Sequence, residues 1–132
     1  MNIDWNKWLD LEAEHKRLEA GQEFARERLD DATLDLRNVE ASLLRSAAGF
    51  GVFRRFAAGD WLRDIKANPE AALARHAEHP ISAILGQFVR AQDAHHRAAE
   101  RHQRAERSYA LHSQSFFRIR DWIRDQQSRG LI

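Results

Sequence analysis

The chain has 132 residues, a formal net charge of +1 and no cysteine. Its length predicts one domain over residues 1–132, and a hydrophobic content of 43% is enough for a core. The lack of cysteine excludes disulfides and thiolate zinc sites, and no apolar run reaches the roughly 18 residues of a membrane span. Because no signal-peptide pattern is present, we expect a cytoplasmic protein without a membrane span.

The first predicted element is a long helix over residues 4–48. Gly21 is its only helix breaker, and the segment is rich in Ala, Leu, Glu and Arg. Asp4 is a good N-cap residue, and Ile3 and Trp8 on either side of it have the spacing of a hydrophobic staple. The sequence therefore predicts a helix that begins directly after Asp4.

A bend with short helices is expected over residues 49–79. Asp60 is a candidate N-cap for one short helix. Asn68 followed by Pro69 predicts the start of another, with Asn68 as the cap and Pro69 in the first turn. The connection is therefore predicted to be a small helical cap rather than a tight turn.

A second long helix is expected over residues 80–128. Pro80 suits its first turn, and Gly130 is available as the C-cap. Since no segment alternates with a period of two residues, the chain is predicted to be all-α.

Both long helices repeat their apolar and small residues every seven positions, which is typical of a coiled-coil seam. In the first helix the two rows are Trp8, His15, Gln22, Leu29, Leu36 and Leu43, and Leu11, Leu18, Ala25, Ala32, Val39 and Ser46. In the second they are Ile81, Phe88, His95, His102, Tyr109, Phe116 and Ile123, and Ile84, Ala91, Ala98, Ala105, His112, Ile119 and Gln126.

The two seams match when the chain folds back on itself. Large residues then face small ones, as Leu29 faces Ala98 and Leu36 faces Ala91, while His15 falls opposite His112. The fold class is therefore predicted as a long antiparallel helical hairpin with a coiled-coil-like seam and a short helical cap at the bend.

The bend carries an aromatic cluster that is our first candidate binding site. Phenylalanine recurs at every third position beside two arginines, and a tryptophan follows. One interpretation is that these rings close the end of the hairpin, and the other is that they form an exposed tip that docks another protein or a membrane surface. The candidate protein-binding residues are Phe50, Phe53, Arg54, Arg55, Phe56 and Trp61.

An arginine stripe on the second long helix is the alternative site. Guanidinium groups on one helix face can follow a nucleic-acid backbone, although acidic residues on the same helix also fit a solvated, ion-paired face. The candidate residues are Arg90, Arg97, Arg101, Arg104 and Arg118.

The histidines are the third group of candidate functional residues. Six of the seven lie in residues 67–132. His76 and His79 have the spacing of a metal-ligand pair, but no third ligand is evident. Histidines on the seam fit a register-setting role, and a further hypothesis is that their protonation below about pH 6 loosens the hairpin.

Several apolar residues lie off the seam and exceed what one hairpin can bury. Either the bend region folds back along the hairpin and covers them, or two hairpins pack into a four-helix dimer, and we expect the homodimer. These residues are Phe24, Leu34, Leu44, Val89, Leu111, Phe117 and Trp122, with Trp5 and Leu9 near the chain ends.

The motifs of common enzyme classes are missing from the sequence, which has no glycine-rich phosphate loop, nucleophile elbow or zinc-helix motif. We therefore expect a non-enzymatic protein-interaction or oligomerisation module without cofactor or metal. It would bind through the aromatic bend, the off-seam apolar residues, or both. Nucleic-acid binding by the arginine stripe is the alternative, and a small inhibitor protein of a mobile element is a third hypothesis.

Overall fold

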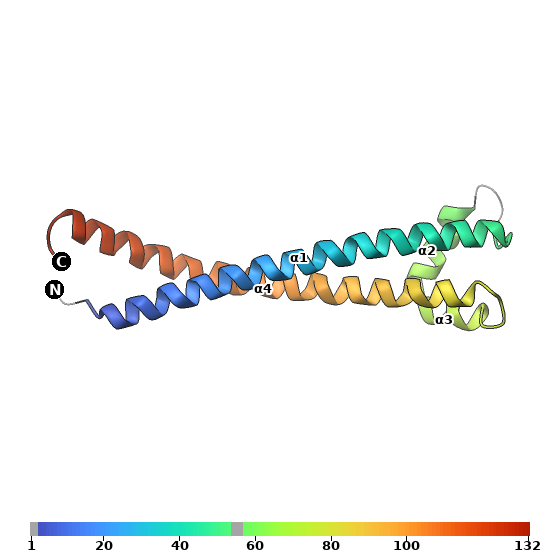
Figure 1. The fold of residues 1–132 in the computed structure, drawn as a ribbon, viewed down its shortest axis with the longest axis horizontal. Helices are drawn as coiled ribbons and strands as arrows, with labels where there is room; N and C mark the ends of the chain where they lie inside the picture. The colour runs from blue at the N-terminus through green and yellow to red at the C-terminus, as the bar shows by residue number, and fades with distance from the viewer. Residues whose placement is uncertain (1–2, 54–56) are drawn as a thin grey trace. The chain divides into compact units, whose positions relative to one another are not determined.

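The computed structural model describes residues 3–53 and 57–132, which form helices and contain no strand. The helices are α1 (Trp5–Gly49), α2 (Ala58–Ala67), α3 (Pro69–Arg75) and α4 (Ser82–Ser128). Long helix α1 packs antiparallel against long helix α4, and α2 and α3 lie at the bend between them (Figure 1). The predicted all-α helical hairpin is thus confirmed.

Both ends of α1 are set by the residues around them. The Lys7 amide donates to the Asp4 Oδ1 atom at 3.2 Å, which confirms Asp4 as the N-cap. After the last turn, Gly51 adopts φ +68°, its amide donates to the Ala48 carbonyl, and the Val52 amide donates to the Ala47 carbonyl. This pair of bonds is a Schellman motif, which needs a left-handed residue and therefore favours glycine.

Helix α4 begins slightly later than predicted. Its first residue is Ser82, so Pro80 lies before the helix and not in its first turn. The His79 Nδ1 atom accepts a hydrogen bond from the Ile81 amide at 3.0 Å, which satisfies a backbone donor at the helix start. At the other end, Gly130 has φ +69° and forms a second Schellman motif with Leu131, as its predicted C-cap role requires.

The short helices show one correct and one wrong cap prediction. The Asn68 Oδ1 atom accepts from the Ala71 amide at 3.2 Å, with Pro69 as the first residue of α3. Asp60, in contrast, is not an N-cap, because α2 begins at Ala58 and Asp60 lies in its first turn. There its carboxylate pairs with Arg63 at 3.5 Å.

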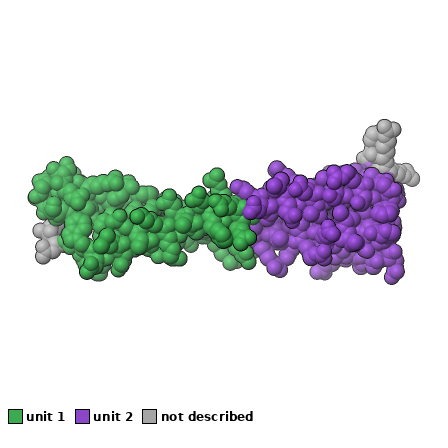
Figure 2. All heavy atoms as spheres, in the orientation of Figure 1, with its two compact units in different colours: residues 1–28, 99–132 green, residues 29–98 purple. Residues whose placement is uncertain are grey.

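The chain divides into two compact units, each containing parts of both long helices (Figure 2). Unit 1 comprises residues 1–28 and 99–132, and unit 2 comprises residues 29–98. The expectation that they act as one domain stays a prediction.

Unit 2 holds the main hydrophobic core, to which all four helices contribute. Phe88, Leu43, Ile65, Ile81 and Leu85 are its largest fully buried side chains. Ala47, Leu62 and Ala72 complete the cluster. The short helices therefore cover apolar surface that a bare two-helix hairpin would leave in water.

The heptad rows account for the packing of α1 against α4 within each unit. Every predicted seam residue is buried or half-buried except Ile119. In unit 1 the buried seam residues are His15, Phe116, Ile123 and Gln126. The seam rows thus identify the inward-facing side of both long helices.

Candidate functional site

The aromatic rings of the bend form a continuous chain of contacts with two histidines. Phe50 meets His79 edge-on at 5.3 Å between ring centroids, and Phe53 lies 5.4 Å from Trp61. His76 joins the two pairs, lying 6.3 Å from both Trp61 and His79. The structure therefore brings three of the predicted site residues together, whereas Arg54, Arg55 and Phe56 lie outside the described residues.

These bend residues differ in their exposure. Phe53 and Trp61 are half-buried and pack against the core of unit 2. Phe50 is 51% exposed. Two of the aromatic rings of the bend thus help to close the core, and the Phe50 ring stays accessible to solvent.

His76 is the half-buried histidine that joins the two ring pairs. Burial lowers the pKa of His76, and the neighbouring Arg75 and His79 lower it further. The His79 Nδ1 atom is already occupied by the Ile81 amide. Along residues 3–53 and 57–132, no group of three or more histidine, aspartate or glutamate side chains could hold a metal ion.

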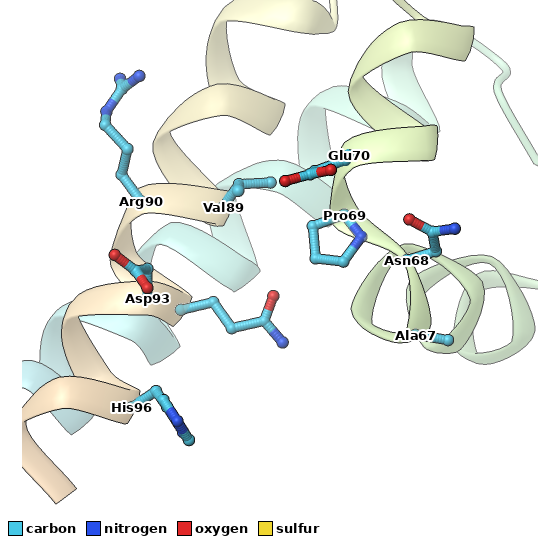
Figure 3. Close-up of a pocket in the computed structure, with 9 residues that line it drawn as sticks. Ala67, Asn68, Pro69, Glu70, Val89, Arg90, Asp93 and His96 are labelled. Atoms are coloured by element: carbon cyan, nitrogen blue, oxygen red, sulfur yellow. The ribbon is translucent and has the colours of Figure 1, made fainter. Parts of the chain in front are cut away.

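A cleft of about 600 Å³ opens in unit 2 between the α2–α3 junction and α4 (Figure 3). In the close-up the Pro69 ring and the Glu70 carboxylate face α4, while the Arg90 side chain points away from the cleft. The lining residues are Ala67, Asn68, Pro69, Glu70, Val89, Arg90, Gln92, Asp93 and His96. They carry charges of both signs and include no hydroxyl or thiol nucleophile.

The predicted arginine stripe is divided between the units and partly paired. Arg97 contacts Asp93 at 3.0 Å, and Arg104 contacts Glu100 at 4.0 Å, both within one turn of α4. The other three, Arg90, Arg101 and Arg118, are exposed. Paired, exposed arginines of this kind fit a solvated helix face as well as they fit a phosphate-binding face.

Unit 1 contains a stack of aromatic and imidazole rings across its seam. Phe116 stacks on both Trp8 and His15. Its ring centroid lies 5.2 Å from that of Trp8, with an angle of 8° between the ring planes, and 4.0 Å from that of His15, with an angle of 7°. His112 lies 5.7 Å from His15, as the fold-back predicted. The stack therefore holds the N-terminal part of α1 against the C-terminal part of α4.

The two histidines of this stack have few polar partners among the described residues. The Nδ1 atom of His15 and both ring nitrogens of His112 are buried without a hydrogen bond. The His15 Nε2 atom lies 3.8 Å from a Glu19 carboxylate oxygen. Nearby, a hydrogen bond from Arg17 lowers the pKa of the Glu14 carboxyl, and His112 adds a smaller lowering.

Several large apolar side chains near the free ends of α1 and α4 are exposed. Trp5 is 45% and Leu9 59% exposed on α1, and Ile119 is 37% and Trp122 41% exposed on α4. Two of the four tryptophans of the chain therefore face solvent in one unit.

Ile119 and Trp122, but not Trp5 or Leu9, line a groove of about 270 Å³ that we call the free-end groove. Six apolar side chains and two charged ones line it: Ile3, Trp8, Leu11, Ile119, Trp122 and Ile123, with Asp4 and Lys7. The seam pattern had assigned Ile119 to the interior. The heptad pattern gave no signal for its exposure, since Ile123 and Gln126, which follow Ile119 on the seam, are buried.

No protein family, curated protein or solved structure matches this chain. Of the helices in the described part of the chain, none combines the length and apolar composition needed to cross a lipid bilayer.

Proposed function

We propose that this chain is a non-enzymatic helical interaction module that binds another protein through the free ends of α1 and α4. The observation that carries the proposal is the exposed apolar surface around the free-end groove. Trp122 both lines this groove and keeps 41% of its surface in solvent. Large exposed apolar patches mark interaction sites, and tryptophan is enriched among the residues that dominate binding energies.

The bend supports this function less strongly than the free ends. Phe53 and Trp61 already pack against the core of unit 2, so only part of their surface is available to a partner. Phe50 is the exposed member and offers a secondary contact. The proposal therefore assigns the main binding surface to unit 1.

Affinity capture with single substitutions tests the assignment. We expect Trp122→Asp to reduce partner recovery at least tenfold, because it places a charge where an indole would be buried. The control is Gln103→Asp, which introduces the same charge at an exposed polar residue of the same helix that does not line the groove. Equal recovery by both variants and the wild type, with helicity retained, would refute the proposal.

A Phe50→Asp variant separates the bend from the free ends. If recovery falls with Phe50→Asp and is unchanged with Trp122→Asp, the binding surface lies at the bend and the assignment to unit 1 is wrong.

A further inference from the structure

We infer that the partner at the free-end groove is a second copy of this chain, related to the first by a two-fold axis. The inference rests on the proposed function, since it names the partner of the same surface. Two features of unit 1 support it. The groove contains charged residues of both signs, and the α1 and α4 segments of unit 1 have opposite net charges.

The charged residues of the groove are complementary to themselves. Asp4 and Lys7 both line it, and a spacing of three residues places them on one face at the start of α1. In a two-fold interface, residue i of one copy meets residue j of the other, and j meets i. Asp4 of each copy can therefore meet Lys7 of the second copy, so that neither charge faces its own sign.

The two helix segments of unit 1 are complementary as well. Residues 3–28 carry 5 Lys or Arg against 7 Asp or Glu, a balance of −2. Residues 99–132 carry 7 against 4, a balance of +3. A second hairpin that lays its basic α4 segment beside the acidic α1 segment of the first is attracted, whereas a strongly acidic or strongly basic partner would be repelled by one of the two segments.

The apolar residues of the groove supply the contact that these charges orient. Trp122 and Ile119 lie one turn apart on α4 and line the groove beside the half-buried Trp8. Pairing two such grooves covers the exposed Trp122 indole of each copy in a single interface. This arrangement is a four-helix contact between two hairpins, in which packing of side chains between helices is the usual source of stability.

Sedimentation or light scattering of the purified full chain tests the inference. We expect the wild type to have twice the chain mass of 15.3 kDa, with a dissociation constant of about 1 µM or below. Trp122→Asp should raise this constant at least tenfold, and Gln103→Asp should leave it unchanged. A wild type that is still monomeric at a protein concentration of roughly 100 µM would overturn the inference. A Trp122→Asp variant with the dissociation constant of the wild type would overturn it as well.

Charge reversal tests the two-fold pairing itself. Lys7→Glu places two carboxylates together in each symmetric pair, and we expect it to weaken the dimer severalfold. Adding Asp4→Lys to this variant restores opposite charges, so the double variant should recover most of the lost affinity. Because Asp4 also caps α1, helicity is measured for each variant, and Lys16→Glu serves as the control on the same helix. A double variant no tighter than Lys7→Glu, with helicity retained, contradicts the pairing.

The failure of this inference differs from the failure of the proposed function. A monomeric wild type whose capture of a different protein still depends on Trp122 would overturn the homodimer and leave the interaction module standing. A dimer that survives Trp122→Asp, together with unchanged capture, would overturn both.

Discussion

The His15 imidazole lies parallel to the Phe116 ring at 4.0 Å between centroids, with its Nδ1 atom buried and without a hydrogen bond among the described residues. A histidine in this position contributes mainly as a flat ring that fills the seam. Its polar atoms add a desolvation cost that a hydrocarbon ring would not carry.

Substitutions at His15 should separate the contribution of the ring from that of its nitrogens. We expect His15→Ala to lower the free energy of unfolding by about 2 kcal/mol, because it leaves a cavity beside Phe116. His15→Phe should keep the stack and match or exceed the wild-type stability. Urea denaturation followed by circular dichroism measures both changes. A His15→Phe variant as unstable as His15→Ala would show that the imidazole nitrogens are needed.

The seam histidines differ in their surroundings. His15 and His112 lie together in the stack of unit 1, whereas the His102 Nε2 atom lies 3.3 Å from a Glu106 carboxylate oxygen. The hypothesis that protonation of the seam histidines loosens the hairpin stays a prediction.

Much of the fold could be predicted because its determinants are local or periodic. The heptad rows located the seam, and the oxygen of Asn68 and the missing side chain of Gly130 marked helix ends. Asp60 was misplaced because α2 starts at Ala58, earlier than the nearest good cap residue. A helix start that lacks a side-chain cap leaves no such mark in the sequence.

The candidate sites were harder to predict, because their contacts join residues far apart in the chain. The ring chain of the bend brings Phe50 to His79 and Trp61 to His76, and no periodic rule relates these positions. The free-end groove joins Lys7 at the start of α1 to Ile119 and Trp122 near the end of α4, positions that no local rule relates. The heptad position of Ile119 predicts burial, although its side chain is 37% exposed.

The glycine after α1 provides a matched pair for a stability test. Gly51 has φ +68° and open space around its Cα, so Gly51→Ala should cost about 1 kcal/mol through backbone strain alone. Gly21 also has open space but lies within α1, where Gly→Ala should stabilise by about 0.8 kcal/mol. Thermal unfolding of the two variants should therefore shift in opposite directions. Destabilisation by Gly21→Ala would contradict the helical assignment at that position.

If protein binding is the function, the arginine stripe should give the chain little affinity for nucleic acid. We expect little binding of the wild type to duplex DNA at physiological salt, because exposed charges are screened at about 0.15 M ionic strength and Arg97 and Arg104 pair with acids of α4. Changing Arg101, Arg104 and Arg118 to glutamate should leave helicity unchanged. Fluorescence anisotropy at several salt concentrations measures the binding. Tight binding that falls steeply with salt and disappears in the triple variant would favour the nucleic-acid alternative instead.

The lowered pKa of His76 gives unit 2 a defined pH dependence. The folded state resists protonation of His76, since burial comes first among the causes and Arg75 and His79 add to it. Between the folded pKa and the ordinary value of 6.5, the unfolded chain therefore binds more protons than the folded chain. The stability that neutral His76 contributes is complete above pH 6.5 and is lost as the pH falls through the folded pKa. We expect the midpoint temperature of thermal unfolding to be lower at pH 5.5 than at pH 7.5. This difference should be smaller in His76→Gln, because the glutamine side chain is neutral at both pH values. An equal difference in the variant would assign the pH dependence to other groups.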